Sequence, residues 1–334
     1  MKEIWRILVA MVLFIAVLIL PALVHKLSYI PHFEVKSVRL VNDYGIPSFR
    51  ISFNTSDYPI YFYLLTPEGE RIDFLDVIGP MANPDNAIDL HLIPCCNYTN
   101  IIGPKKYVIK AYYENKELWS SVFEVKGAKA NLKIADVEFN ASSELFLRRI
   151  TLEIKNEGDV SLRLEDLKLY LDYSCEPFAI SPSTPAHDDI LSVPLGNSSR
   201  VNIHPSSFIS SKHLDEEHRI VVMLPRIAEA SYIIKPLKPE LRIRSMGVRQ
   251  SPEGLYVDNI TLTILNTWNY PINIRWLELY VNGKPASYWI PSATMINPGE
   301  ERNLTLYISS MRTQLPVMVS AKLGGVEVFY LYKG

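Results

Sequence analysis

The chain has 334 residues, of which 21% are charged and 11% are aromatic, and its formal net charge is −2. This length allows two or three domains that each bury a core. The small net charge and the lack of a basic stripe argue against a nucleic-acid-binding protein. The three cysteines are an odd number, which excludes a framework of fully paired intramolecular disulfides.

The first predicted element is an apolar helix near the N-terminus. Residues 7–24 carry no charge, and a helix of this length is roughly 27 Å long, close to the thickness of a bilayer core. Lys2 and Arg6 favour a cytoplasmic N-terminus, although Lys26 on the other side weakens this bias. We therefore predict a single-pass signal-anchor over residues 1–30, with the bulk of the chain extracytoplasmic and the cell membrane as the first partner.

A cleaved signal peptide is the main alternative for this segment. The apolar run is longer than the core of a usual signal peptide, and Ala22-Leu-Val-His25 is a poor cleavage site, so the uncleaved anchor is favoured. A buried core helix is a further alternative. No second apolar span follows in the sequence, which predicts one membrane-spanning segment.

Beyond residue 32 the sequence alternates apolar and polar residues with the period of a β-strand. In the first such run Phe33, Val35 and Leu40 are expected to be buried. Similar runs, rich in β-branched and aromatic residues, cover residues 150–154, 162–171, 260–264 and 272–281. Turn sequences separate the runs, among them Asn156-Glu-Gly158, Asn282-Gly283 and Asn297-Pro-Gly299. The chain after the first segment is therefore predicted to be all-β.

A short motif occurs three times along this β-region. Asn54-Thr-Ser-Asp-Tyr-Pro-Ile60 matches Asn266-Thr-Trp-Asn-Tyr-Pro-Ile272, and a looser copy begins at Asn156. The copies begin about 100 residues apart, which is the size of one β-sandwich domain and not of a solenoid repeat. We therefore predict three tandem β-domains, over residues 31–128, 129–237 and 238–334.

The third copy carries a family resemblance. Residues 265–283, followed by Ile296-Asn-Pro-Gly-Glu300, are similar to the cell-adhesion-related domain of prokaryotic surface proteins and to the water-stress domain of late-embryogenesis-abundant proteins. The second copy has His204-Pro205 in place of Asn297-Pro-Gly299, and the first departs from the pattern after Glu70. The resemblance implies three tandem seven-stranded immunoglobulin-like β-sandwich domains and a surface or adhesion role. It transfers no catalytic residue.

Six Asn-x-Ser/Thr sequences are candidate glycosylation acceptors, which agrees with an extracytoplasmic location. They begin at Asn54, Asn97, Asn140, Asn197, Asn259 and Asn303. Polar β-turn residues without glycan are the alternative interpretation. A disulfide between Cys175 and either Cys95 or Cys96 is possible if the first two domains pack together, whereas unpaired thiols are the favoured alternative.

Candidate metal ligands are densest in the second domain. His187-Asp188-Asp189 and the stretch from His213 to His218 supply imidazoles and carboxylates that suit a divalent metal. His213 and His218 are not spaced as a helical zinc pair, and both stretches lie between predicted strands, so solvated loops are favoured. A metal-dependent hydrolase that uses His187, Asp189, His213 and His218 is the remote alternative. No cofactor is expected, and the sequence has no Gly-x-Ser-x-Gly and no phosphate-binding loop.

Trp268, Tyr270 and Trp289 are the candidate partner-binding residues. Exposed Trp and Tyr rings at a domain tip provide a large contact area at low entropy cost, as a protein or glycan partner requires. Packing is the alternative, and the presence of Tyr58 in the equivalent turn favours it for Tyr270.

The sequence as a whole predicts a membrane-anchored adhesion or scaffold protein of the cell surface without catalysis. An accessory ectodomain of a larger membrane complex, such as a transporter or secretion machinery, is the alternative. No nucleic acid and no small-molecule substrate is expected.

Overall fold

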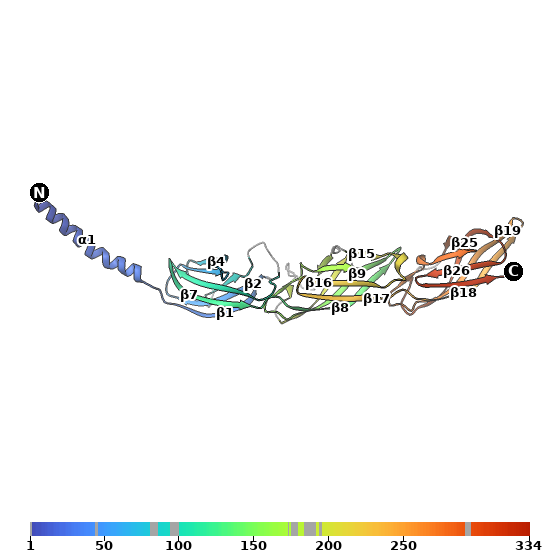
Figure 1. Cartoon of the computed structure of the whole chain (residues 1–334), viewed down its shortest axis with the longest axis horizontal. Helices are drawn as coiled ribbons and strands as arrows, with labels where there is room; N and C mark the ends of the chain where they lie inside the picture. The colour runs from blue at the N-terminus through green and yellow to red at the C-terminus, as the bar shows by residue number, and fades with distance from the viewer. Residues whose placement is uncertain are drawn as a thin grey trace. The chain divides into compact units, whose positions relative to one another are not determined.

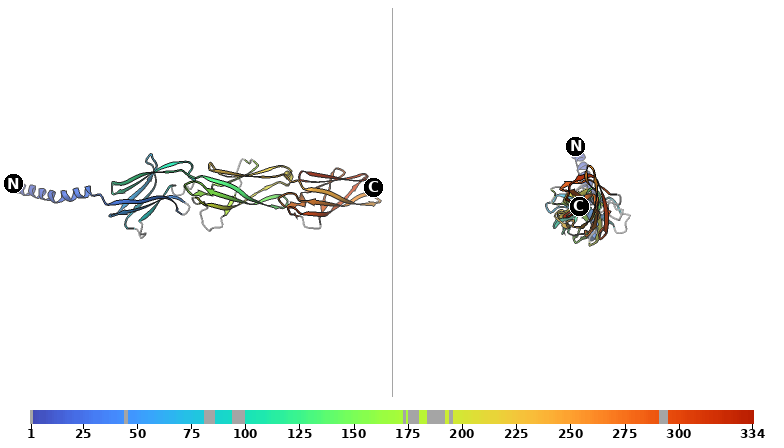
Figure 2. Two further views of the ribbon diagram at one scale, coloured as in Figure 1. Left: turned by 90° about the horizontal axis from the view of Figure 1, so that it is seen from below. Right: turned by 90° about the vertical axis from the view of Figure 1, so that its right-hand side faces the viewer.

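The structure is a computed structural model, shown in Figures 1 and 2. It describes residues 2–43, 46–80, 86–93, 100–172, 174, 180–183, 192–193, 196–290 and 295–334. These residues form two compact units, one of residues 1–128 with 158–161 and the other of residues 129–157 with 162–334. Because this division gives two units, the predicted limits of three domains stay a prediction.

The chain begins with helix α1, Lys2–Ser28, which contains Pro21 (Figure 1). The side chains described on this helix, those of Trp5 and of residues 8–21, are all exposed. The predicted helix is confirmed. Among the described residues, no helix is both long and apolar enough to cross a membrane, so the predicted membrane span is not supported.

The first β-sandwich consists of two antiparallel sheets, ordered β1-β2-β5 and β4-β3-β6-β7. Its strands are β1 Phe33–Asp43, β2 Ile46–Thr55, β3 Ile60–Leu65, β4 Arg71–Val77, β5 Ala87–His91, β6 Lys105–Tyr113 and β7 Lys116–Val125. This arrangement of seven strands is the predicted immunoglobulin-like one.

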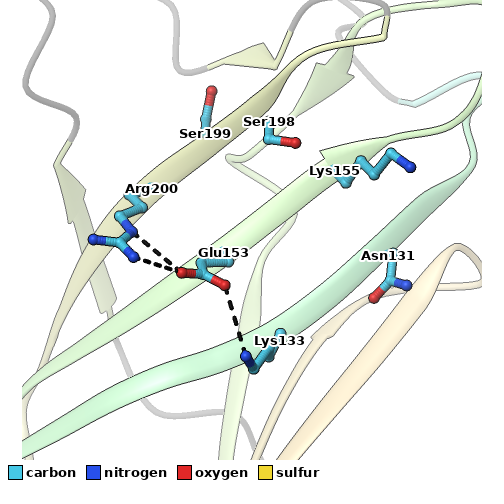
Figure 3. A pocket seen from close by; sticks show the side chains of 7 residues that line it. All are labelled: Asn131, Lys133, Glu153, Lys155, Ser198, Ser199 and Arg200. Carbon is cyan, nitrogen blue, oxygen red and sulfur yellow. Dashed lines mark hydrogen bonds and ion pairs between the residues drawn. The ribbon is translucent and has the colours of Figure 1, made fainter.

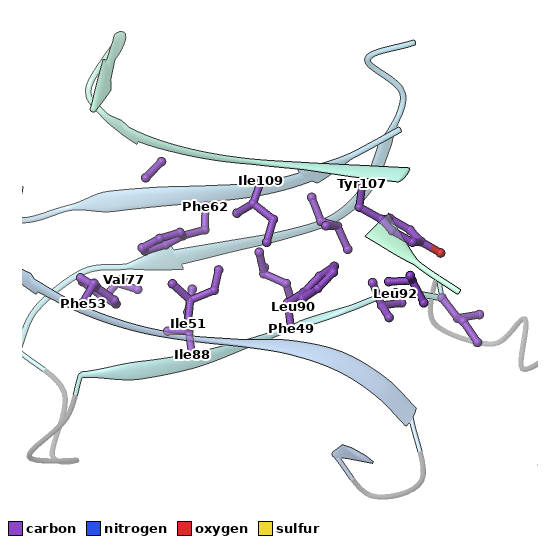
Figure 4. Close-up of a cluster of buried hydrophobic side chains, with 14 of the residues drawn as sticks. Phe49, Ile51, Phe53, Phe62, Val77, Ile88, Leu90, Leu92, Tyr107 and Ile109 are labelled. Carbon is purple, nitrogen blue, oxygen red and sulfur yellow. The ribbon is translucent and has the colours of Figure 1, made fainter. Parts of the chain in front are cut away.

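Alternation along the strands builds the core of this sandwich. In β3, the side chains of Ile60, Phe62 and Leu64 are fully buried in the core between the two sheets. Figure 4 shows Phe62 in this core together with Phe53 of β2 and Ile109 of β6. Each such burial contributes about 1.5–3 kcal/mol.

The first strand shows how a bulge changes this alternation. Phe33, Val35 and Leu40 pack against the core as predicted, although they are only partly buried. The pairing of β1 with β2 shifts between Val35 and Ser37, and this bulge lets residues on both sides of it face the core.

The second β-sandwich has a larger sheet in which β8, β14 and β15 pair with β9 and β12 pairs with β14, and a smaller sheet ordered β11-β16-β17. A short ladder joins β10 to β13. The elements are β8 Ala130–Ala141, β9 Leu145–Asn156, β10 Leu162–Arg163, β11 Lys168–Leu171, β12 Ile180–Ser183, β13 Ser192–Val193, β14 Ser198–Pro205, β15 Ser207–Ile209, the 3₁₀ helix η1 Ser211–His213, β16 His218–Leu224 and β17 Ala228–Ile234.

The third β-sandwich pairs the sheets β18-β19-β25-β23 and β22-β21-β26-β27, with β20 and β24 as a short extra ladder. The elements are β18 Glu240–Ser251, β19 Gly254–Leu265, β20 Ile272–Asn273, the 3₁₀ helix η2 Ile274–Trp276, β21 Glu278–Val281, β22 Lys284–Pro285, β23 Tyr288–Trp289, β24 Met295–Ile296, β25 Glu301–Thr313, β26 Val317–Leu323 and β27 Val326–Tyr332. The all-β, immunoglobulin-like architecture predicted after the helix is therefore confirmed for the described residues.

Candidate functional site

The two histidines described among the predicted metal ligands have structural partners, whereas His187 and Asp189 lie outside the described residues. His218 is buried at the start of β16, with Nδ1 2.7 Å from Oδ2 of Asp172 and Nε2 2.8 Å from the backbone oxygen of His213. Because a backbone oxygen only accepts hydrogen bonds, Nε2 carries a hydrogen and offers no lone pair to a metal. His218 therefore fixes the loop before β16 to the end of β11.

His213 lies on the exposed side of the same loop. Its Nδ1 is 3.2 Å from Oε1 of Glu216, and both side chains are more than half exposed. Among the residues that the structure describes, no three His, Cys, Asp or Glu side chains are placed to hold a metal ion. The interpretation as a solvated loop fits His213, and the hydrolase hypothesis gains no support from either histidine.

Trp268 and Tyr270 lie where the third sandwich meets the second, and each is only 7% exposed. Nε1 of Trp268 donates to the backbone oxygen of Lys235 at 2.8 Å. The hydroxyl of Tyr270 lies 2.7 Å from that of Tyr232, and its ring packs edge-on against Phe139 with 4.6 Å between centroids. The prediction that these two rings are exposed, as a partner-binding tip requires, is therefore wrong. The preceding sandwich covers them with an apolar surface and provides their hydrogen-bond partners.

The local electrostatics of this contact follow from its burial. Burial and the hydrogen bond with Tyr232 raise the pKa of Tyr270 well above its ordinary value. The rings of Trp268 and Tyr270 also contact each other edge-on, with 5.0 Å between centroids. The turn thus holds two aromatic rings in contact with each other, and the second sandwich covers both.

Asn266 holds this turn in shape. Its Nδ2 donates to the backbone oxygens of Tyr270 and Ile296 at 2.8 and 2.9 Å, and its Oδ1 accepts from the backbone N–H of Trp268 at 2.9 Å. Asn266 is completely buried, whereas Asn54, its counterpart in the repeated motif, is exposed. In the first sandwich Thr55 makes the side-chain hydrogen bond to the turn, because its Oγ1 accepts from the backbone N–H of Asp57 at 3.3 Å.

The turn of the first sandwich contacts the segment that follows α1. The backbone N–H of His32 donates to Oγ of Ser56 and the backbone N–H of Ser56 donates to the oxygen of His32, both at 3.0 Å. The hydroxyl of Tyr29 donates to the carboxylate of Asp57, which raises the pKa of Tyr29 and lowers that of Asp57. The first and third sandwiches thus use equivalent turns to bind the chain that precedes them.

Residues 158–161, which belong to the looser copy of the motif that begins at Asn156, are part of the first compact unit. The carboxylate of Asp159 accepts from the backbone N–H groups of Lys126 and Gly127 at 2.7 and 2.8 Å, and Val160 is buried in the core of that unit. The repeated motif therefore marks a contact with the preceding segment at each of its three positions.

Two further residues of the junction between the second and third sandwiches were not among the predicted site residues. Nε1 of Trp276 donates to the backbone oxygens of Ser142 and Ser143, both at 3.0 Å, and Nδ2 of Asn273 donates to the oxygen of Ser142 at 2.8 Å. The signal in the sequence that could have indicated this contact is the pair of small residues Ser142 and Ser143 at the tip of the β8–β9 hairpin, because small side chains leave the backbone oxygens accessible. The cavity beside Trp276 holds about 20 Å³, enough for one water molecule.

Trp289 is the one predicted aromatic that the structure leaves exposed, at 63%. Its ring lies 5.8 Å from that of Tyr307, which is 46% exposed. Trp289 borders an open groove of about 490 Å³ that is also lined by Arg275, Leu277, Ala286, Ser287, Tyr288 and Ile290. Tyr288 is structural, because its hydroxyl donates to the backbone oxygens of Ile274 and Leu277, and burial raises its pKa to about 12. The groove therefore offers an aromatic platform with one nearby guanidinium.

A second groove, of about 370 Å³, crosses the larger sheet of the second sandwich (Figure 3). Glu153 lies at its centre, 2.7 Å from Arg200 and 3.9 Å from Lys133 on the neighbouring strands. The hydrogen bond from Arg200 lowers the pKa of Glu153. Lys155 lies 3.7 Å from Glu157. Exposed ion pairs of this kind contribute little free energy, so the groove is an ordinary charged sheet surface.

The candidate acceptors of glycan differ in accessibility. Asn54, Asn140 and Asn197 are exposed. Asn303 is exposed, but its Oδ1 accepts from Oγ1 of Thr263 at 2.5 Å. Asn259 is half-buried over Gly247, where a Cβ would come within 2.5 Å of its Nδ2.

Asn97 and the three candidate disulfide residues Cys95, Cys96 and Cys175 lie outside the described residues. Glycosylation and disulfide formation stay predictions.

No protein-family model and no curated protein matches the chain. Several solved β-sandwich proteins are similar to it at low identity. The I9–I11 tandem of titin is 10% identical over 90% of this chain and 98% of its own, with a TM-score of 0.32. A segment of two fibronectin type III domains from chicken tenascin is 10% identical over 61% of this chain and 98% of its own, with a TM-score of 0.22.

The archaellum periplasmic stator protein FlaG from Sulfolobus acidocaldarius is 18% identical over 31% of this chain and 99% of its own, with a TM-score of 0.22. Similarities this weak say nothing about function. The resemblance to the cell-adhesion-related and water-stress families stays a prediction.

Proposed function

We propose that this chain is a non-catalytic scaffold that α1 attaches to a membrane and whose β-sandwiches present a partner-binding surface outside the cytoplasm. The surface of α1 is the observation that supports this most. All side chains from Leu8 to Leu20 are apolar and exposed, so the helix has no polar face over this stretch. A helix that is apolar on every side requires an apolar environment, either a protein core or lipid. Since no described part of the chain covers these side chains, we propose lipid.

The energetics of such an attachment are favourable. Each large apolar side chain removed from water contributes about 1.5–3 kcal/mol. Lys2 and Arg6 lie on the N-terminal side of the apolar stretch, and positive residues favour the cytoplasmic side of a membrane. We therefore propose a cytoplasmic N-terminus and extracytoplasmic sandwiches.

Alkaline carbonate extraction of membranes from cells that express the full chain tests the attachment. The wild-type chain is expected to stay in the membrane pellet. The double variant Leu13→Lys/Val17→Lys is expected to move to the supernatant, because each lysine costs about 2.5–3.5 kcal/mol at the centre of an apolar helix. Leu13→Ile/Val17→Ile is the matched control and should remain in the pellet. A wild-type chain in the supernatant would contradict the proposal.

Protease treatment of intact spheroplasts tests the orientation. With a tag at each end of the chain, we expect the sandwiches and the C-terminal tag to be digested and the N-terminal tag to be protected. The reverse pattern would place the sandwiches in the cytoplasm and overturn this part of the proposal.

The groove beside Trp289 is the partner-binding surface that we propose. Its support is the exposed pair of Trp289 and Tyr307 next to the guanidinium of Arg275, since Trp, Tyr and Arg dominate binding energies at interfaces. Binding of the full chain to surface proteins and to a glycan array would identify the class of partner. Trp289→Ala is expected to weaken binding at least tenfold, and Trp289→Phe is expected to retain most of it. Equal binding by wild type and Trp289→Ala would exclude this groove.

A further inference from the structure

The larger sheet of the second sandwich carries two phenylalanines on its outer face. Phe146 of β9 and Phe208 of β15 lie directly opposite each other in the ladder that joins these strands, and their ring centroids are 5.5 Å apart. They are 41% and 53% exposed, whereas Leu145 and Leu147 on either side of Phe146 are buried. The two rings therefore lie on the surface of the sandwich and not in its core.

A candidate acceptor of glycan lies next to these rings. Asn140 of β8 is opposite Phe146 in the β8–β9 ladder, so Asn140, Phe146 and Phe208 form one row across three adjacent strands. Asn140 is exposed and its neighbours Phe139 and Ala141 are buried, so its side chain points to the same outer face as the two rings. Strands are spaced by about 4.8 Å, which places the rings about one and about two spacings from Asn140.

The aromatic pair in this row is not required by the fold. Asn140 and Phe146 form the second pair of the β8–β9 ladder, counted from its hairpin. The second pair of the β18–β19 ladder is Gln250 with Leu255, and Leu255 is opposite Thr313 of β25. The third sandwich thus builds the same position without an aromatic ring. What distinguishes the second sandwich here is the combination of two exposed rings with an acceptor sequence.

Three of the other candidate acceptors have no aromatic neighbour in their ladders. Asn54 is opposite Glu34 of β1. Asn303 is opposite Thr263, whose hydroxyl donates to its Oδ1. Asn197 directly precedes β14 and so lies outside the ladders of the described strands. In contrast, no hydrogen bond among the described residues involves the side-chain amide of Asn140, and this amide is accessible beside the rings.

Asn259 also has aromatic neighbours, but its amide is not accessible. It is opposite Tyr307, which in turn is opposite Trp289. A Cβ at position 247 would lie 2.5 Å from Nδ2 of Asn259, so this nitrogen packs against the backbone of β18 at Gly247 and leaves no room for a sugar. The Trp289 groove therefore stays open to a partner, whereas the row of Asn140 has an acceptor of its own.

We propose that Asn140 is N-glycosylated and that the first two sugars of its glycan cover Phe146 and Phe208. The C–H groups on one face of a sugar ring are apolar, and they leave water when that face stacks on an aromatic ring. The spacing of the strands places Phe146 beside the first sugar and Phe208 beside the second. This proposal rests on the extracytoplasmic location proposed above, because N-linked glycans belong to the surfaces of secreted chains.

The attachment is the transfer of a sugar chain from a lipid-linked sugar phosphate by a membrane-bound oligosaccharyltransferase of the cell. Nδ2 of Asn140 forms a bond to the anomeric carbon of the first sugar, while the bond between this carbon and the phosphate oxygen of the lipid carrier breaks. The carrier phosphate leaves with the electron pair of that bond, and Nδ2 loses one proton. Ser142 supplies the hydroxyl that completes the acceptor sequence Asn140-Ala-Ser142.

Mass spectrometry of peptides from the full chain, purified from the cells that naturally produce it, tests the attachment. We expect glycan on Asn140 in most molecules of the wild type and in none of Ser142→Ala. This variant removes the hydroxyl but keeps the backbone oxygen that accepts from Trp276. Ser142→Thr is the matched control and should keep the glycan. An unmodified Asn140 in the wild type would overturn the proposal.

Two further results separate this failure from a failure of the proposed location. If Asn140 is unmodified while Asn54 or Asn197 carries glycan, or while protease treatment of spheroplasts digests the sandwiches, only the present proposal fails. If the sandwiches are protected from the protease, the extracytoplasmic location fails, and the glycan on Asn140 fails with it.

The melting temperature of the glycosylated chain tests the contact with the rings. We expect the transition that includes the second sandwich to lie about 2–4 °C lower in Ser142→Ala than in the wild type, because the two rings lose their cover. In a Phe146→Ser/Phe208→Ser background, Ser142→Ala should lower it by less than about 1 °C. Phe329→Ser, at a ring of the third sandwich that is 62% exposed, is the matched control and should keep the full difference. Equal differences in all three backgrounds would show that the glycan does not cover Phe146 and Phe208.

Discussion

The indole N–H of Trp268 donates to the backbone oxygen of Lys235, and the Trp268 side chain is only 7% exposed where the second and third sandwiches meet. We predict that Trp268→Phe lowers the free energy of unfolding by about 1 kcal/mol, because this hydrogen bond is lost while most of the ring packing stays. Trp268→Ala should cost about 3–5 kcal/mol, since it also leaves a cavity. Chemical denaturation of the full chain measures both values.

The exposed Trp289 provides the control for this measurement. Trp289→Ala removes a ring of the same size from a site that is 63% exposed, and it should change the free energy of unfolding by less than about 0.5 kcal/mol. Similar costs for the alanine variants at positions 268 and 289 would mean that the turn does not pack as described.

Buried tyrosines make the fold sensitive to alkali. Burial raises the pKa of Tyr107 and of Tyr288 to about 12, from the ordinary value of 10.0. The unfolded chain then loses these protons before the folded chain does, so stability is constant below about pH 10 and falls as the pH rises from about 10 to 12. We expect Tyr107→Phe to make this decline shallower, measured as the melting temperature between pH 8 and 12. An unchanged slope would show that Tyr107 titrates alike in both states.

At the scale of the elements, the turn between β19 and β20 depends on Asn266. Asn266→Ala leaves the oxygens of Tyr270 and Ile296 and the N–H of Trp268 without their partner. An unsatisfied buried group costs about 1–3 kcal/mol, so we expect a loss of at least about 3 kcal/mol in the free energy of unfolding. Asn54→Ala, at the matching but exposed position of the motif, should change it by less than about 0.5 kcal/mol. Thermal unfolding of both variants decides whether the two positions differ as their burial indicates.

The elements themselves could largely be predicted from the sequence. Alternation placed Phe33, Val35 and Leu40 against the core, and Asn282-Gly283 marked a turn whose residues both have positive φ. These signals are local, because the period of a strand and the shape of a turn depend on adjacent residues. The partner of a turn is not a local property. The sequence around Trp268 and Tyr270 is compatible both with an exposed tip and with a covered junction, and only the preceding sandwich decides between them.

At the scale of the whole molecule, the repeated motif joins the second and third sandwiches, which its composition does not reveal. Tyr232 and Phe139 of the second sandwich pack on Tyr270 of the third, and the two sandwiches belong to one compact unit. Contacts of this kind couple the unfolding of neighbouring domains. When one sandwich unfolds, the contact surface of the other becomes exposed to water, and this exposure costs free energy. The length of the repeat predicted separate domains, but it contained no information about the surface buried between them.

Gly324 provides a test of this coupling. It has a φ of +58°, and a Cβ added there would lie 2.6 Å from the backbone oxygen of Leu237, in the segment that joins the second and third sandwiches. Gly283 also has a positive φ, of +75°, but a Cβ there would meet nothing within 4 Å. Alanine at either position carries the strain of the left-handed region, about 1–2 kcal/mol. Only Gly324→Ala also separates the two sandwiches.

Differential scanning calorimetry of the full chain distinguishes the two effects. We expect the second and third sandwiches of the wild type to unfold in one transition, and Gly283→Ala to lower its temperature without dividing it. Gly324→Ala should divide it into two transitions, since each sandwich then unfolds without support from the other. If both variants gave one transition lowered by the same amount, the contact at Leu237 would not couple the sandwiches, and the repeated turn would only connect domains that unfold independently.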